Sequence, residues 1–296
     1  MNSIFNDIKS NFKTGSSFTR LLYVNLGVFL IIKILSAFGF LFKINDVNHF
    51  IESYLSLPSN LSELVKKPWT LISYMFVHQD FLHILFNMVW LHFGSKLFLQ
   101  YFNGKQLLST YFLGGIFGGL IYISAFNIFP VFQDTPFINS VAIGASASVL
   151  AIFIAIATYS PNYIVNLTFI GNTFIKHIAI FLVVLDFLLI EKNNPGGHIA
   201  HLGGAIFGFL YINLLRKGVD LSVNFYTFLS YFKSSEKTKL KKVHKNRSSK
   251  NNDDIFRNKK SDKQKKINSI LEKISKSGYD SLTKEEKELL FKESKS

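Results

Sequence analysis

Cysteine is absent from the 296-residue sequence, which excludes disulfide bonds and thiolate metal sites. The sequence shows no cluster of metal-ligating residues and no glycine-rich phosphate loop, so we expect neither a metal nor a cofactor. Acidic residues are also few, because 19 Asp and Glu stand against 33 Lys and Arg and give a formal net charge of +14. In a soluble protein, such an excess of basic residues would indicate nucleic-acid binding.

The distribution of residues changes that interpretation. The chain up to about residue 216 is rich in Phe, Ile, Leu and Gly, whereas much of the Lys and Arg follows in a tail that is also rich in Ser and Asn. Basic residues next to a membrane domain are typical of the cytoplasmic side of the bilayer. We therefore expect a lipid bilayer around the first part of the chain and no nucleic-acid partner.

Six apolar stretches approach the roughly 20 residues that a helix needs to cross a bilayer core of about 30 Å. They lie at residues 21–42, 82–102, 106–126, 140–159, 174–190 and 198–215. The loop between the first two, residues 43–81, carries Trp69 and other aromatic side chains, so we expect it to pack at the membrane surface. These patterns predict an all-α membrane protein with six transmembrane helices.

Six spans place both termini on one side of the membrane, and the basic residues outside the first and last spans assign that side to the cytoplasm. We expect a multi-pass protein of the bacterial inner membrane. In this topology the second, fourth and sixth spans run inward, and each carries polar residues near its start. These pairs are His83 with Asn87, Ser146 with Ser148, and His198 with His201. The pattern predicts that three helices bring polar groups to one depth.

The sequence divides into four parts. Residues 1–20 form an N-terminal cytoplasmic segment, and residues 21–216 form the membrane domain. Residues 217–262 combine an interfacial helix with a basic linker. We expect this linker to be disordered, from residue 233 to residue 265. Residues 263–296 predict a small cytoplasmic helical hairpin, with Gly278 ending its first helix and Thr283 and Glu286 in capping-box spacing. The sequence identifies no partner for this tail.

Ser146 lies in a run of small residues, Gly144-Ala145-Ser146-Ala147-Ser148, at the start of an apolar stretch. A serine hydroxyl becomes a nucleophile only when a base removes its proton, so Ser146 needs an imidazole within about 3 Å. His201 is the best candidate, because Gly204 and Gly208 follow it at helical spacing and allow close helix packing. The sequence therefore predicts Ser146 as nucleophile and His201 as general base.

Acyl transfer also needs hydrogen-bond donors for the negative oxygen that develops in the transition state. His83 and Asn87 are four residues apart and share one helix face, so we assign them to this oxyanion or substrate-binding site. We add Gly144 and His78 to the same group. The alternative for His83 and Asn87 is hydrogen bonding between helices without a chemical role.

At these residues the sequence resembles the rhomboid family of intramembrane serine proteases, over about residues 67–215. The resemblance rests on Trp69, His78, His83 to Asn87, Gly144 to Ser146, and Ala200 and His201 with Gly204 and Gly208. It implies a six-helix bundle that cleaves peptide bonds in or near transmembrane segments of other membrane proteins. By position, it implies a Ser146–His201 dyad, with His83 and Asn87 as oxyanion side chains.

Three alternatives remain beside this prediction. A catalytically inactive rhomboid-like protein would bind membrane helices without cutting them, and Ala147 keeps this open because the family usually has glycine after the serine. A small transporter would use the polar cluster as a substrate path, but its expected internal symmetry is not visible. Ser148 is the less favoured nucleophile.

Two other polar residues remain. Asp186 is a functional candidate as an intramembrane carboxylate, yet the sequence shows no partner for it. His198 is expected at the rim.

Overall fold

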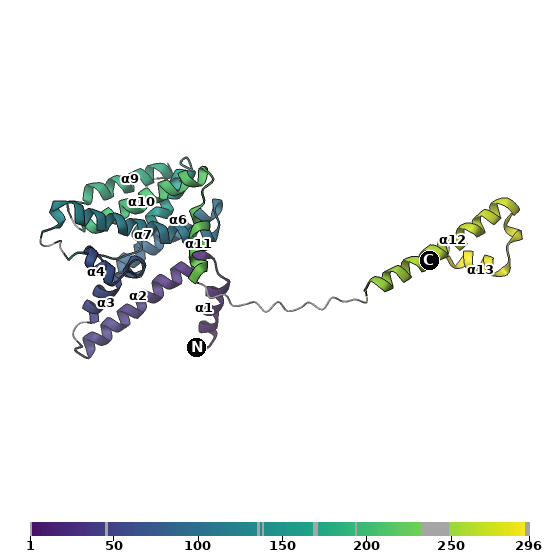
Figure 1. The fold of residues 1–296 in the computed structure, drawn as a ribbon, viewed down its shortest axis with the longest axis horizontal. Coiled ribbons are helices and arrows are strands. Elements are labelled where there is room, and N and C mark those ends of the chain that lie inside the picture. Colours follow the sequence, from purple (N-terminus) through teal and green to yellow (C-terminus); the bar gives the residue numbers. More distant parts are fainter. Residues whose placement is uncertain are drawn as a thin grey trace. The chain divides into compact units, whose positions relative to one another are not determined.

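The structure is a computed structural model that describes residues 2–44, 47–134, 137, 139–167, 171–192, 194–232 and 249–293. The chain divides into two compact units, Met1–Ser234 and Ser235–Ser296. The first unit contains most of the apolar helices, and the second contains the charged C-terminal helices. Each unit is considered by itself (Figure 1).

The first unit is built mainly from helices. Those that follow the predicted apolar stretches are α2 (Ser17–Leu41), α6 (Phe81–Tyr101), α7 (Gly104–Ile128), α8 (Ser146–Tyr159), α9 (Ile175–Leu189) and α10 (Pro195–Arg216). A short helix, α1 (Asn2–Thr14), precedes them, and α11 (Leu221–Phe232) follows them. Helix α10 packs against α7, α8 and α9, whereas α2 leaves the bundle obliquely (Figure 1).

The predicted surface loop between α2 and α6 is folded. It contains α3 (Val47–Leu55), β1 (Leu57–Pro58), α4 (Leu61–Lys66), α5 (Thr70–Ser73) and the 3-10 helix η1 (Tyr74–Phe76). The indole nitrogen of Trp69 donates a hydrogen bond of 2.8 Å to the Tyr54 carbonyl, and the Ser73 hydroxyl donates one of 2.7 Å to the Leu55 carbonyl. These bonds satisfy polar groups within the loop, so the segment forms a defined structure beside the bundle.

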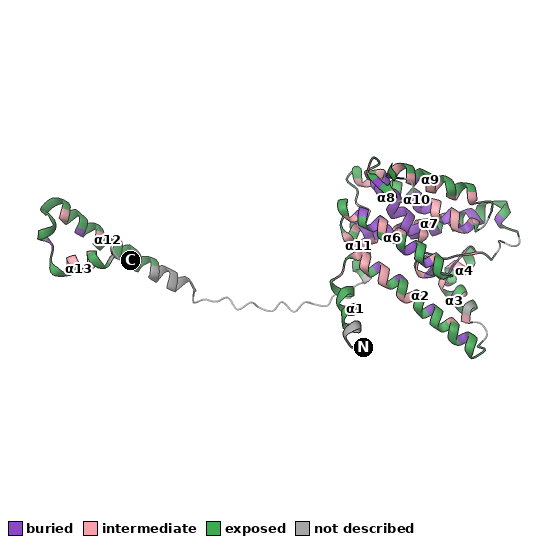
Figure 2. Ribbon diagram, turned by 180° about the vertical axis from the view of Figure 1, so that it is seen from behind, coloured by how far each residue is buried: buried purple, intermediate pink, exposed green. Residues whose placement is uncertain are grey.

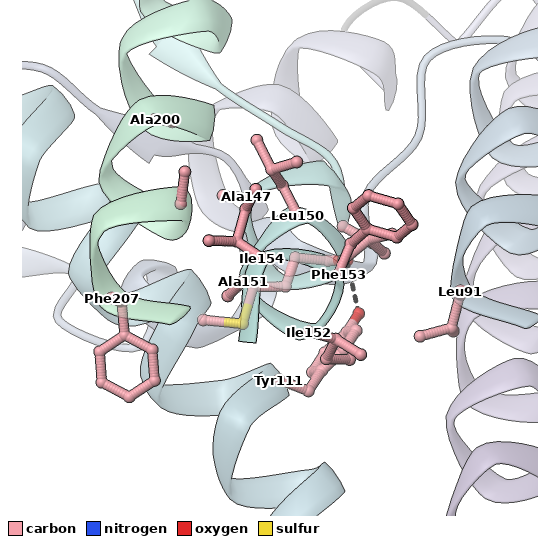
Figure 3. Close-up of a cluster of buried hydrophobic side chains, with 14 of the residues drawn as sticks. Leu91, Tyr111, Ala147, Leu150, Ala151, Ile152, Phe153, Ile154, Ala200 and Phe207 are labelled. Atoms are coloured by element: carbon pink, nitrogen blue, oxygen red, sulfur yellow. Dashed lines mark hydrogen bonds between the residues drawn. The ribbon is translucent and has the colours of Figure 1, made fainter. Parts of the chain in front are cut away.

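Helix α8 forms the centre of the first unit. Every residue from Ala147 to Ala157 is buried, as expected for a helix that is apolar all round. In Figure 2 the buried residues gather on α7, α8 and α10, whereas α2 and α9 are largely exposed. The close-up in Figure 3 shows Ala147 and Ala151 of α8 on the side that faces Ala200 and Phe207 of α10. The fold therefore surrounds the helix that begins at Ser146.

The start of α8 corrects the sequence-based boundary. The predicted span began at residue 140, but α8 begins at Ser146 because the preceding residues are extended. Strand β2 (Val141–Ala142) pairs antiparallel with β1, with Leu57 opposite Ala142. Gly144 then adopts a φ of +114°, which is incompatible with a right-handed helix. Ser146 is consequently the first residue of the helix.

Four of the described helices are long and apolar enough to cross a membrane: α2, α6, α7 and α10. Helix α8 is apolar but has only 14 residues, and α9 has 15. At 1.5 Å per residue, each of these two helices extends about 21–23 Å, which is shorter than a bilayer core. The protein is therefore mostly helical with several candidate membrane spans, and the count of six stays a prediction.

Three short elements complete the first unit. The 3-10 helix η2 (Pro130–Phe132) follows α7, and the antiparallel strands β3 (Ile164–Leu167) and β4 (Gly171–Phe174) connect α8 to α9. The connection from α9 to α10 is short, and Asn194 in it has a left-handed φ of 56°. Its side chain accepts a hydrogen bond of 3.1 Å from the Gly197 amide and thereby caps α10.

The second unit contains α12 (Ser249–Ser277), the 3-10 helix η3 (Tyr279–Ser281) and α13 (Lys284–Glu293). Helix α12 ends before Gly278, whose φ is +76°. Thr283 and Glu286 exchange hydrogen bonds in the capping-box pattern at the start of α13. The predicted disordered linker was wrong for residues 249–265, which belong to α12; the helix continues from there through the apolar positions Ile267 and Ile270. Residues 233–248 of that linker lie outside the described residues.

Candidate active site

The first residue of α8 meets the second turn of α10. The Nε2 atom of His201 lies 2.5 Å from the Oγ atom of Ser146, which is hydrogen-bond distance. Because Ser146 is at the N-terminus of α8, the first backbone N–H groups of this helix have no acceptors within the helix. The two side chains expected to form the dyad therefore share a hydrogen bond beside a set of free helical donors.

Glycine residues on α10 make this contact possible. A Cβ atom added to Gly204 would collide with the backbone carbonyl of Ala147, and one added to Gly208 would collide with the carbonyl of Ala151. On the neighbouring α7, a Cβ on Gly118 would lie 2.6 Å from the Ala200 carbonyl. Small residues thus let the backbones of three helices approach closely, which fixes the distance from serine to imidazole.

The other nitrogen of the His201 ring contacts a carboxylate, which corrects the sequence-based view of Asp186. The Oδ1 atom of Asp186 on α9 lies 2.9 Å from Nδ1 of His201 and 2.8 Å from Nδ1 of His198. The sequence identified no partner for Asp186, and the structure supplies two. His198, expected at the rim, does not line the cavity but shares this carboxylate with His201. The signals in the sequence were an intramembrane carboxylate and two histidines at i and i+3. Which faces of α9 and α10 meet could not be predicted.

His83 and Asn87 lie on one face of α6, as their spacing indicates. Asp80 caps this helix by accepting a hydrogen bond of 2.8 Å from the His83 amide, a role that the sequence analysis missed. The side-chain nitrogen of Asn87 donates a bond of 2.9 Å to the His83 carbonyl. An amide nitrogen carries two hydrogens, so Asn87 retains a second donor.

Gly144 allows the His83 ring to approach the serine. Its φ of +114° is unfavourable for any residue with a side chain. A Cβ atom at this position would lie 2.7 Å from Nε2 of His83 and 3.7 Å from the Ser146 hydroxyl. The glycine therefore leaves the space in which an imidazole and a hydroxyl lie next to the same backbone segment.

His78 lies behind His83 in the wall of the site, in the loop before α6. Its side chain is buried, with 1% of its surface exposed, and its ring centroid is 5.0 Å from that of His83. Nδ1 hydrogen-bonds the Phe76 carbonyl at 3.2 Å, whereas Nε2 has no partner in the part of the chain that the structure describes. Burial, and secondarily the neighbouring His83, lower the pKa of the His78 imidazole to about 4.

This low pKa predicts a loss of stability in acid. In the unfolded chain His78 takes up a proton below about pH 6.5, whereas the folded protein resists protonation until about pH 4. Between these values the unfolded state binds more protons than the folded state. The free energy of unfolding therefore decreases as the pH is lowered, by up to about 3 kcal/mol. Thermal unfolding in detergent should show a shallower decrease for His78→Phe, which keeps an aromatic ring but cannot titrate. Equal pH slopes for the two proteins would contradict this account.

A cavity of about 1030 Å³ connects these side chains. His78, His83, Asn87, Ser146, Asp186 and His201 all line it, together with apolar residues such as Trp90, Phe153 and Leu182. Its volume is at the upper end of the range for ligand pockets, about 300–1,000 Å³. The cavity therefore exposes the serine and imidazole to a space with both polar and apolar walls.

Ser148 lies elsewhere on α8. It is fully buried, and its hydroxyl has no hydrogen-bond partner among the described residues. A Cβ atom on Gly115 of α7 would collide with this hydroxyl, so Ser148 faces α7 instead of the cavity. This position offers Ser148 no base.

The Asp186, His198 and His201 side chains place three potential ligand atoms within 4.8 Å of one another. Tetrahedral zinc with bonds of about 2.0–2.1 Å would hold such atoms about 3.3 Å apart. The observed separations of 2.8 and 2.9 Å are instead those of hydrogen bonds. We therefore interpret these three side chains as a hydrogen-bonded cluster. That the protein needs no metal stays a prediction.

The helical bundle, with its candidate membrane spans, thus carries a hydrogen-bonded Ser–His pair on the wall of a cavity. Comparison with known proteins identifies the Rhomboid domain over residues 65–218. The chain belongs to the rhomboid family. A second match, over residues 250–296, is to a family of unknown function, DUF6576.

The chain is also similar to the RHOMBOID-like protein 12, mitochondrial, of Arabidopsis thaliana. The two sequences are 30% identical over 164 residues, which is 50% of this chain and 47% of the relative. The chain thus spans about half the length of this curated relative.

Proposed function

We propose that this protein is an intramembrane serine endopeptidase that cleaves peptide bonds in or near transmembrane segments of membrane proteins. The observation that carries this proposal is the 2.5 Å contact between the Ser146 hydroxyl and His201 Nε2 on the wall of the large cavity. Membership of the rhomboid family supports it. No cofactor is part of the proposal.

The reaction follows from the contact between these two side chains. His201 Nε2 takes the proton from Ser146 Oγ while that oxygen attacks the carbonyl carbon of the substrate peptide bond. The resulting imidazolium gives this proton to the leaving nitrogen as the C–N bond breaks, which leaves an acyl group on Ser146. Water then attacks the acyl group, with His201 removing its proton, and the serine hydroxyl is regenerated.

The tetrahedral intermediate carries a negative oxygen that needs donors. We assign this role to Asn87 Nδ2, His83 and the first backbone N–H groups of α8; Asn87, His83 and Ser146 all line the cavity. The apolar lining residues, which include Trp90 and Phe153, suit the apolar side chains of a membrane segment. The polar lining residues admit the water that hydrolysis consumes.

Truncation of one oxyanion donor gives a measurable prediction. Asn87→Ala should lower kcat by about 10²-fold, with a smaller change in KM, because the donor acts mainly on the charge of the transition state. Steady-state cleavage of a transmembrane reporter measures both constants. Asn213→Ala is a matched control, since Asn213 on α10 also donates to a carbonyl one turn earlier, at 2.9 Å, but does not line the cavity. A similar loss in both variants would contradict the assignment.

The test of the function itself uses the full-length protein in detergent with a generic transmembrane reporter and a fluorophosphonate. We expect cleavage by the wild type, none by His201→Ala, and covalent labelling at Ser146 identified by peptide mass. Absence of both cleavage and labelling would instead favour an inactive rhomboid-like protein that binds membrane helices. The cytoplasmic side of the termini stays a prediction from the charge distribution. The bacterial inner membrane also stays a prediction, which the comparisons do not support, since the similar Arabidopsis protein is named as mitochondrial.

A further inference from the structure

We infer that Asp186 is a positioning residue for His201, and that His198 holds Asp186 in place. The inference rests on the proposed function, because it concerns the base of the same reaction. It replaces an isolated Ser–His dyad by a chain of hydrogen bonds that runs from Ser146 through His201 to Asp186. Three helices, α8, α10 and α9, contribute one member each.

The geometry fixes which atoms carry protons. An ionised carboxylate has acceptors only, so both histidines must donate to Asp186 Oδ1 from Nδ1. With its proton on Nδ1, the neutral His201 ring has a free lone pair on Nε2, the atom that lies beside the Ser146 hydroxyl. Asp186 therefore selects the tautomer that can accept the serine proton.

The same carboxylate favours the next state of the reaction. When His201 takes the serine proton, its ring becomes an imidazolium with a positive charge. Asp186, 2.9 Å from Nδ1 and with 14% of its side-chain surface exposed, supplies a negative charge in an environment of low dielectric. The attraction is greater for the imidazolium than for the neutral ring, so it lowers the barrier to proton transfer.

His198 explains how the carboxylate is held. His198 and His201 are three residues apart and lie on one face of α10, and their Nδ1 atoms reach the same oxygen. The short connection between α9 and α10, with α10 capped by Asn194, places Asp186 opposite both rings. A carboxylate in a membrane bundle is costly without partners, and two donors offset that cost.

A purely structural role for Asp186, as a tie between α9 and α10, predicts a different result. Such a tie would change the stability of the protein but not the reactivity of Ser146 in the molecules that remain folded. The distinguishing measurement is the rate at which a fluorophosphonate labels Ser146, because a small reagent reports nucleophile activation without substrate binding. Reporter cleavage adds the separation of kcat from KM.

The experiment compares Asp186→Asn and Asp186→Glu with the wild type in the full-length protein. Asparagine keeps the shape of the side chain but loses the charge and can stabilise the wrong tautomer, so labelling and kcat should fall by about 100-fold or more, with KM little changed. Glutamate restores the charge and should recover part of the rate. His198→Ala leaves one donor in place and should cost about three- to tenfold.

Asp220→Asn is the matched control. Asp220 accepts hydrogen bonds from the Gln106 side chain at 3.0 Å and from the Ser222 amide at 2.9 Å, and it does not line the cavity. We expect this variant to lower the unfolding temperature while the labelling rate stays at the wild-type value. If Asp186→Asn does not fold, Asp186→Glu and His198→Ala carry the comparison.

If the Asp186→Asn variant were labelled at the wild-type rate, or if all variants were labelled at equal rates, the inference would be overturned while the proposed function stayed intact. A wild-type protein that neither cleaves the reporter nor reacts at Ser146 would instead contradict the proposed function. The two failures are therefore distinguishable.

Discussion

Replacement of Ser146 by alanine is expected to abolish both reporter cleavage and fluorophosphonate labelling, with a loss in kcat of about 10⁴-fold or more. The change removes the oxygen that lies 2.5 Å from His201 Nε2, so no acyl intermediate can form. Stability should change little, because Ser146 is only half-buried and the α8 helix beyond it is apolar. Cleavage assays and labelling of the purified protein give the result.

Ser148→Ala is the matched control, since it makes the same substitution two residues further along the same helix. The Ser148 hydroxyl is buried without a hydrogen-bond partner among the described residues, so its removal should leave activity unchanged and slightly increase stability. Equal activity of wild type and Ser146→Ala would remove the nucleophile assignment. Loss of activity in Ser148→Ala alone would transfer the assignment to the other serine.

Gly204→Ala is expected to have the second large effect. The added methyl group would collide with the Ala147 carbonyl, so α8 and α10 must separate. Overpacking of this kind costs about 1–3 kcal/mol of stability. The separation also moves His201 away from Ser146, and a shift of about 1 Å can cost about 10²-fold in rate. Thermal unfolding and the labelling rate should therefore both decrease.

Gly27→Ala is the control for this prediction. Gly27 lies in the middle of α2, and a Cβ atom there would meet nothing within 4 Å. Because alanine favours a helix over glycine by about 1 kcal/mol, this variant should be as stable as the wild type or more so. If Gly204→Ala behaved like Gly27→Ala, the helix contact would not control the site.

Several features of the fold and the site were predictable from the sequence because they depend on local patterns. Apolar stretches predicted the approximate positions of the long helices, and the family resemblance is confirmed by the Rhomboid domain. The sequence predicted the pairing of Ser146 with His201 because glycines follow His201 at helical spacing and small residues flank Ser146. His83 and Asn87 were paired because residues four apart share a helix face.

The remaining features depend on contacts between segments. The pairing of Asp186 with His198 and His201 requires that particular faces of α9 and α10 meet, which no periodicity specifies. The late start of α8 depends on β2 pairing with β1, whose residues lie more than 80 positions earlier. The extension of α12 to Ser249 was not predicted, because the charge and the Asn, Asp and Ser content of this segment favoured disorder.

The enclosure of α8 has a consequence for the way lipids act on the protein. A lipid-facing helix of 14 residues would be too short for a normal bilayer, and the mismatch would force local thinning. Because Ala147 to Ala157 are covered by protein, α8 is insulated from that penalty. Bilayer thickness therefore acts on Ser146 only indirectly, through the outer helices, and the depth of Ser146 is set by the protein itself.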